Sequence, residues 1–282
     1  PPIHISKSKL KGINYNMPIS SAQVKSSILL AALGSDTVTK ITEKVTSRDH
    51  SEIMLKNIGV DITTDGRSII VAPCNKFLPL DIHIPADPST AAFFIGATVL
   101  MPGSRLRVMN MLLNETRIGF IKALEKMGCS FNYYNVHKEA GEKVGDIEVT
   151  YHKLHGINID ASDIPSIIDE LPMLALIASQ ARGITKVSGA KELRVKESDR
   201  IKAICKNLRE IGGDIEEKSD GFIINGGTEL TSGNIDTFDD HRIAMTFHIA
   251  SLISGKKISL NNTNCVNISF PDFFKTIESI VR

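Results

Sequence analysis

The sequence has little of what several classes of protein require. Its four cysteines stand far apart, at 74, 129, 205 and 265, and no pair has the spacing of a metal site or a redox motif. This unpatterned placement suits a reducing compartment. The formal net charge is only +1, so the whole chain has no electrostatic attraction to nucleic acid or to a membrane surface. These absences argue against a disulfide framework, a metal centre and a nucleic-acid binder.

Long hydrophobic runs are also missing. The longest one, AAFFIGATVLM at 91–101, is too short to span a bilayer, and no basic-then-apolar leader stands at the start. Apolar residues are nevertheless plentiful, at 42% of 282 residues, which is enough for one or two globular cores. We therefore expect a cytoplasmic protein that has no membrane partner.

Internal similarity is the most informative pattern in the chain. An almost wholly apolar helical segment, followed by glycine and a short strand, recurs at 23–41, 91–109, 171–189 and 242–260. Amphipathic helical segments that lead into strands alternate with these, at 52–71, 120–151 and 201–225. Helices that are apolar on all sides must be buried, and amphipathic ones must lie outside them. The pattern predicts an α/β protein of about three and a half copies, which start near Ser21, Ser89, Asp169 and Asp239.

Polar residues gather where the apolar helices are expected to begin. Helix capping explains SSAQ at 20–23 and DPST at 87–90, since Ser and Asp are preferred caps and Pro suits the first turn. Capping does not explain Arg242 in DDHR, or Arg200 in LRVKESDR behind an expected cap at Ser198, because cations oppose the dipole at a helix N-terminus.

Two interpretations of these cations stay open. Arginines beside free N–H groups form a strong clamp for a phosphate or carboxylate ligand. Alternatively, the charges form a structural ion-pair network, with Arg200 bound to Glu197 or Asp240 bound to Arg242. The pattern alone gives the two interpretations similar weight.

Six segments together resemble the 5-enolpyruvylshikimate-3-phosphate synthase family over nearly the whole chain and in the family's order. They are SAQVKS (21–26), TSRDHSE (46–52), LLNETRIGFI (112–121), RVKESDRI (194–201), DDHRIAM (239–245) and NISFPDFF (267–274). The resemblance implies two globular domains built from repeated βαβαββ units with buried helices, an inside-out α/β barrel. It places residues 1–85 in the remainder of the first domain, as one repeat, and 86–282 in a nearly complete second domain of three repeats.

The resemblance also implies a reaction. The family transfers the enolpyruvyl group of phosphoenolpyruvate to the 5-hydroxyl of shikimate-3-phosphate and releases phosphate, by addition and elimination, with neither metal nor cofactor. Both substrates are small anions, which would account for the clustered cations. We expect no nucleic-acid partner and a monomer.

Roles are carried over residue by residue from this resemblance. Asp169 matches the catalytic aspartate near the sugar-like hydroxyl, Glu197 the acid that handles protons at the enolpyruvyl carbons, and Lys196 a lysine near both substrates. The implied substrate-binding residues are Ser21, Ala22, Gln23, Arg48, Asp169, Lys196, Arg200 and Arg242.

The chain departs from the family pattern at two places. The family's early Gly-Ser-Lys-Ser segment and Gly-x-x-x-Arg loop do not occur, and NISFP stands where another branch has a lysine. The chain therefore resembles the last two-thirds of the enzyme, and we expect it to be inactive without the N-terminal part. Two alternatives are the sister enzyme that acts on UDP-N-acetylglucosamine and a non-catalytic repeat scaffold. RVKESDR argues against the first, and the dipole-opposing arginines argue against the second.

Overall fold

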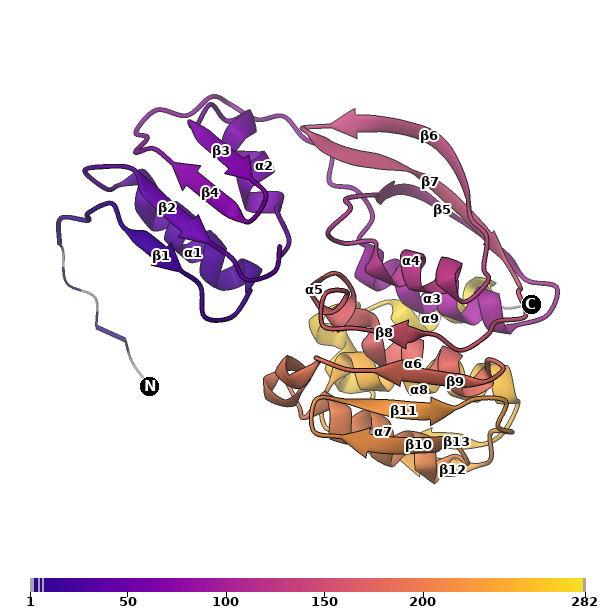
Figure 1. The fold of residues 1–282 in the computed structure, drawn as a ribbon. Helices are drawn as coiled ribbons and strands as arrows, with labels where there is room; N and C mark the ends of the chain where they lie inside the picture. The colour runs from indigo at the N-terminus through magenta and orange to yellow at the C-terminus, as the bar shows by residue number, and fades with distance from the viewer. Residues whose placement is uncertain (1–2, 5, 7, 281–282) are drawn as a thin grey trace. The chain divides into compact units, whose positions relative to one another are not determined.

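A computed structural model describes residues 3–4, 6 and 8–280, and these form two compact units (Figure 1). Unit 1 runs to Ile84 and includes His137–Lys143, whereas unit 2 comprises Pro85–Val136 and the residues from Val144 onward. Pro1 and Arg282, the outer ends of the two ranges expected from the sequence, lie outside the described residues. No helix in the described part of the chain is both long and apolar enough to cross a membrane.

Unit 1 is a four-stranded sheet with two helices. Its elements are β1 (Asn14–Asn16), α1 (Ala22–Leu33), β2 (Thr39–Thr42), α2 (His50–Asn57), β3 (Ile62–Asp65) and β4 (Ser68–Val71). The strand order is β1-β2-β4-β3, with β1 parallel to β2 and the other pairs antiparallel. The core is small, and Leu29 from α1 packs with Ile41, Ile69 and Val71 from the sheet.

Helix α1 is only partly covered within unit 1. The sequence predicts a helix that must be buried on all sides, but only Lys25, Leu29 and Ala32 are buried. Val24 is 42% exposed and Leu30 is 61% exposed. Unit 1 by itself therefore leaves an apolar helix face open to solvent, which increases the tendency to associate.

The tip of a long hairpin completes unit 1. The hairpin joins β6 (Asn132–Glu139) to β7 (Glu142–Thr150), and its tip, residues 137–143, packs on α2. His50 Nδ1 lies 2.6 Å from Glu142 Oε1, and the Asn57 side-chain amide donates to the Ala140 carbonyl at 2.9 Å. The chain consequently passes between the units three times, after 84, after 136 and after 143.

Unit 2 holds the remaining elements. Its helices are α3 (Pro88–Leu100), α4 (Gly119–Lys126), α5 (Ile164–Ile167), α6 (Leu171–Gln180), α7 (Arg200–Glu210), α8 (His241–Ser254) and α9 (Phe273–Ile280). Its strands, besides the arms of β6 and β7, are β5 (Arg105–Leu112), β8 (Asn158–Ile159), β9 (Ile184–Val187), β10 (Asp214–Lys218), β11 (Gly221–Asn225), β12 (Gly233–Ile235) and β13 (Ile258–Leu260). Single 3₁₀ turns occupy Ile168–Glu170, Lys191–Val195 and Asn264–Ile268.

The sheets confirm the α/β class and the internal repeat. The order β8-β9-β11-β10 reproduces β1-β2-β4-β3, with a parallel first pair and antiparallel partners after it. The sheet β5-β7-β6 follows the same scheme, because Ala86 bridges Met111 of β5 in parallel where the first strand would stand. The copies therefore start one strand earlier than the sequence suggested. These first strands have at most three residues, too few for an alternating pattern to be visible.

Three apolar helices form the centre of unit 2. Helices α3, α6 and α8 contact one another, and each packs against a different sheet, through β5, β11 and β13 respectively. The helices pack closely because α3 has a glycine at its contact with α6. A Cβ atom at Gly96 would lie 2.4 Å from Met173 Cε and 2.9 Å from Met173 Cγ.

The replacement Gly96→Ala is expected to destabilise unit 2 by about 1–3 kcal/mol, the usual cost of overpacking a dense core. Met173 would have to leave its rotamer to admit the new methyl group. Urea unfolding monitored by amide exchange in unit 2 measures the change. The double variant Gly96→Ala with Met173→Ala should lose less stability than the two single losses together, because the new methyl occupies vacated space. Additive losses would contradict the close contact.

Candidate active site

The N-terminal ends of the buried helices in unit 2 meet at one place. Asp240 caps α8 by accepting from the Arg242 N–H at 2.9 Å, and Asp87 caps α3 by accepting from the Thr90 N–H at 3.0 Å. Arg242 Nη1 reaches the Asp169 carbonyl at 3.2 Å, just before α6. Capping thus explains the first turn of α3, as the sequence predicts, and the same turns assemble a polar cluster.

Arg200, the first residue of α7, is the hub of this cluster. Its side chain is completely buried and contacts three carboxylates. Nε donates to Asp240 Oδ2 at 2.7 Å, Nη2 to Glu197 Oε2 at 2.6 Å, and Nη1 to Asp169 Oδ1 at 3.4 Å. The ion pair between Arg200 and Glu197, one of the open interpretations, is present. Asp240 binds the Arg200 side chain, however, and only the backbone N–H of Arg242.

Arg242 is held more loosely than Arg200. Its guanidinium lies 3.9 Å from Asp169 Oδ2 and 3.9 Å from Glu170 Oε1, and its side chain is 17% exposed. It therefore keeps donors that a ligand could use, whereas a ligand can bind Arg200 only by replacing one of the carboxylates that already contact it.

Glu170 links this cluster to the start of α3. It is buried, and burial raises the pKa of its carboxyl against the opposing charge of Arg242 and a hydrogen bond from Ser89. Arg117 in turn donates to Asp87 at 2.5 Å and to Ser89 at 2.9 Å. The polar ends of α3, α6 and α8 therefore form one connected network.

The cluster also shifts the pKa of Asp240 and His241. Burial alone would raise the pKa of Asp240, but hydrogen bonds from Arg200, the Arg242 N–H and Ser198 outweigh it and hold the pKa below its ordinary value. Burial lowers the pKa of His241, and the charge of Arg242 lowers it further. Near neutral pH Asp240 is thus an anion and His241 is uncharged.

Two sequence-predicted residues lie at the open side of the cluster. The Glu197 side chain is 54% exposed although it binds Arg200, so its carboxylate has one face toward solvent. Lys196 Nζ binds Glu192 Oε1 at 3.2 Å instead of joining Asp169 or Glu197. The structure thus brings Asp169, Glu197, Arg200 and Arg242 into direct contact and leaves Lys196 beside them with its own partner.

The other predicted binding residues belong to unit 1. Ser21 caps α1, as expected, although its Oγ accepts from the Val24 N–H at a long 3.5 Å. Ala22 and Gln23 form the first turn of that helix, and Arg48 lies just before α2. Ser20 Oγ accepts from the Val45 N–H at 2.8 Å, which ties the chain before α1 to the chain before Arg48.

A buried charged triad supports this part of unit 1. Lys25 Nζ, fully buried, lies 2.6 Å from Glu52 Oε1 and 3.2 Å from Glu43 Oε2. Glu43 Oε1 accepts from both the N–H and the hydroxyl of Ser47, the neighbour of Arg48. The triad therefore fixes the segment that carries Arg48.

Sequence reasoning missed the centre of the network. Asp240 is fully buried at the hub, and Lys25 is a buried cation inside an apolar helix. A lone lysine among the apolar residues of 24–33 was a visible signal for the second. The expected cap at Ser198 was wrong. Asp199 caps α7 by accepting from the Lys202 N–H, while Ser198 donates its hydroxyl to Asp240.

Comparison with curated proteins finds close relatives for the whole chain. A 3-phosphoshikimate 1-carboxyvinyltransferase of Endomicrobium trichonymphae is 48% identical over 98% of this chain and 65% of its own length. The enzyme of the same name from Sulfurihydrogenibium sp. (strain YO3AOP1) is 45% identical over 100% of this chain and 66% of its own length. The chain thus spans about two-thirds of the length of these relatives.

Solved structures give the same result. An EPSP synthase from Acinetobacter baumannii superposes with a TM-score of 0.87 at 37% identity, covering 96% of this chain and 63% of that one. The enolpyruvyl transferase NikO from Streptomyces tendae shares the fold, with a TM-score of 0.73 at 16% identity, over 98% of this chain and 65% of its own. The model of one sequence family, EPSP synthase (3-phosphoshikimate 1-carboxyvinyltransferase), matches residues 1–277. The chain therefore belongs to the EPSP synthase family.

Proposed function

We propose that the enzyme of which this chain forms about two-thirds transfers the enolpyruvyl group of phosphoenolpyruvate to the 5-hydroxyl of shikimate-3-phosphate. In the addition step the 5-oxygen bonds to the central enolpyruvyl carbon, the hydroxyl proton leaves, and the methylene carbon takes up a proton. In the elimination step that carbon loses a proton and the carbon–phosphate oxygen bond breaks. The observation that carries this proposal is the buried Arg200, shared by Asp169, Glu197 and Asp240, with Arg242 beside it.

The two carboxylates can take different roles because their surroundings differ. Glu197 is half-exposed, so it can exchange protons with a ligand and with water. Asp169 is more enclosed and is held in place by contacts with two arginines, so its carboxylate has a fixed position from which to accept the hydroxyl proton. Lys196 would add a mobile cation at the rim after leaving Glu192.

Ligand binding would require a change of partner at Arg200. A phosphate or carboxylate that replaces Glu197 at Nη2 would satisfy the buried guanidinium equally well and release Glu197 for proton transfer. Asp240, which is fully buried and contacts Arg200 through Nε, would hold the arginine in place during this exchange. Residues Ser21, Gln23 and Arg48 of unit 1 would bind the shikimate-3-phosphate.

A direct test measures phosphate release from phosphoenolpyruvate and shikimate-3-phosphate. The chain is assayed alone and after joining to the part of its relatives' length that it does not span, which we call the completed enzyme. We expect turnover with shikimate-3-phosphate, none with UDP-N-acetylglucosamine, and little from the chain alone. Turnover with the UDP-sugar alone would refute the proposed acceptor, and full turnover by the chain alone would refute the need for the remaining part.

Arg242→Ala should weaken phosphoenolpyruvate binding by about tenfold or more, the value of one charge-assisted hydrogen bond. Arg242 is the more weakly held of the two arginines, so its loss removes ligand contacts with little damage to the network. Calorimetric titration of the completed enzyme measures the change.

Two variants control this measurement. Arg242→Lys should recover little affinity, because a point charge cannot reproduce a planar fork. Arg105→Ala removes an arginine that binds Glu148 on the β5–β7 sheet and should leave affinity unchanged. Equal affinity in Arg242→Ala and Arg105→Ala would mean that Arg242 has a structural role only.

A further inference from the structure

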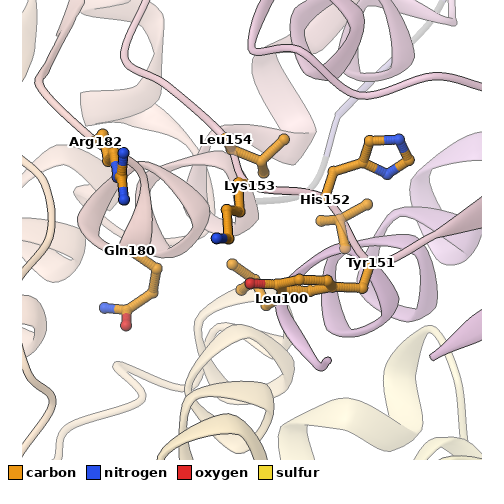
Figure 2. A pocket seen from close by; sticks show the side chains of 8 residues that line it. Leu100, Tyr151, His152, Lys153, Leu154, Gln180 and Arg182 are labelled. Carbon is orange, nitrogen blue, oxygen red and sulfur yellow. The ribbon is translucent and has the colours of Figure 1, made fainter. Parts of the chain in front are cut away.

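A polar cavity opens in unit 2 at the C-terminal ends of two buried helices, away from the cluster around Arg200. Its volume is about 290 Å³, and it lies where α3 and α6 end, beside the segment after β7. We call it the distal pocket and define it by Leu100, Tyr151, Lys153, Leu154, Gln180 and Arg182 (Figure 2). Ten residues of α6, or about 15 Å of helix, separate its Gln180 end from Asp169 and Glu170.

The distal pocket combines unused donors with an apolar lining. In Figure 2 the Lys153 ammonium and the Tyr151 hydroxyl point into one space, with Arg182 and Gln180 on its other sides. Among residues 3–4, 6 and 8–280, the side chains of Lys153, Arg182 and Tyr151 form no hydrogen bond or ion pair, and no acidic residue lines the cavity. The site therefore offers two positive charges and a phenol.

Stabilisation of helix ends does not account for these cations. Lysine and arginine often bind the last carbonyls of a helix. In α6 the carbonyls of Ile177 and Ala178 accept from the Ala181 N–H, and the Ser179 carbonyl accepts from the N–H groups of Gly227 and Thr228. In α3 the Val99 carbonyl accepts from the His152 N–H. Backbone N–H groups thus already bind these carbonyls, so Lys153 and Arg182 are not needed to satisfy them.

The remaining electrostatics favour an anion. Each helix C-terminus contributes about half a negative charge, so two full positive charges exceed the two helix ends together. Arg182 offers a planar fork, Lys153 a mobile ammonium and Tyr151 a hydroxyl, a combination suited to phosphate or carboxylate oxygens. The Tyr151 ring and the Leu100 and Leu154 side chains can contact carbon atoms. The volume is at the lower end of small-molecule sites.

We propose that the distal pocket binds a small oxyanion with a compact apolar group, a phosphate ester or a carboxylate, independently of the cluster around Arg200. The anionic group lies between Lys153 and Arg182, and the carbon skeleton contacts Leu100 and the Tyr151 ring. Gln180 stays fixed at the rim, since its amide nitrogen donates to Ser179 Oγ and to the Thr228 carbonyl.

The test titrates the purified chain with phenyl phosphate, benzoate and inorganic phosphate while amide NMR shifts are recorded. The Arg242→Ala background removes the looser arginine of the other cluster. We expect phenyl phosphate or benzoate to shift the amides of Lys153, Leu154 and Arg182, and inorganic phosphate to bind several-fold more weakly because it lacks the ring. The stronger of the two ring compounds identifies the anionic group.

Variants connect the shifts to the side chains. Arg182→Gln and Lys153→Gln should each weaken binding about tenfold or more. Lys186→Gln, a change at an exposed lysine on β9 outside the pocket, should have no effect. Equal affinities in the pocket variants and Lys186→Gln, or shifts confined to residues near Arg200, would overturn the proposal.

Discussion

Turnover of the completed enzyme is expected to fall about 10²- to 10⁴-fold in Glu197→Gln and in Asp169→Asn, the range typical of lost general acid–base groups. Both changes keep the size of the side chain and leave an oxygen to accept from Arg200, while each removes the ability to take up a proton at that position. Arg200 also keeps its 2.7 Å hydrogen bond to the buried Asp240, so the hub should remain folded. Single-turnover phosphate release measures the chemical step.

The matched control for this prediction is Glu192→Gln. Glu192 is a carboxylate in the same segment that binds Lys196 and does not contact Arg200. Glu192→Gln should reduce turnover far less than Glu197→Gln does. Shikimate-3-phosphate affinity should survive in Glu197→Gln, since the residues proposed to bind that ligand, Ser21, Gln23 and Arg48 among them, are unchanged. Near-normal turnover in Glu197→Gln would assign Glu197 a structural role as the ion-pair partner of Arg200.

Lys25→Met is expected to unfold unit 1, with a loss of about 3–5 kcal/mol, the usual effect of removing one member of a buried ion pair. The replacement leaves Glu43 and Glu52 buried, close together and without their shared cation. The core of unit 1 is small, so it has little stability to lose. Amide hydrogen exchange resolves the two units, and protection should vanish in β2 and α2 while it persists in α6 and α8.

Lys44→Met, at an exposed lysine of unit 1, is the control and should leave exchange unchanged. Glu52→Gln should be much milder than Lys25→Met, because Glu52 Oε2 has no hydrogen-bond partner among the described residues.

The same triad makes unit 1 sensitive to pH. Burial raises the pKa of Glu52 in the folded state, so the folded state binds this proton more strongly than the unfolded state does. The resulting stabilisation is present below the ordinary pKa of glutamate and is lost as the pH rises through the folded pKa. Glu52→Gln should flatten this part of the profile. An unchanged slope would mean that Glu52 does not titrate differently on folding.

The features that could be predicted from the sequence are those fixed by neighbouring residues. Apolar and amphipathic helices follow from residue spacing, and the caps at Ser21 and Asp87 follow from residue type at the helix start. The pairing of Arg200 with Glu197, three residues away, was one interpretation of the sequence, but its pairing with Asp240 did not follow, because Asp240 lies forty residues further along the chain. In the sequence Asp240 stands two residues from Arg242. It reaches Arg200 only because α7 packs against α8.

Burial was the second property that the sequence left undetermined. Helix α1 is mainly apolar, as α6 is, yet Leu30 is exposed and Leu174 is buried, since the neighbouring helices that surround α6 do not surround α1 within unit 1. An apolar composition makes burial of a helix favourable, whereas the number of packed repeats decides whether the helix is buried.

The three passages of the chain between the units limit how the units can be produced as separate fragments. A cut between Ile84 and Pro85 does not release two intact pieces, because residues 137–143 would travel with the larger fragment. The smaller fragment would then lose Glu142 and the Ala140 carbonyl and leave His50 and Asn57 facing solvent. A clean division would shorten the hairpin to a tight turn after Val136 and supply 137–143 to the small fragment as a separate peptide. The affinity of that peptide would measure how firmly the hairpin tip is docked.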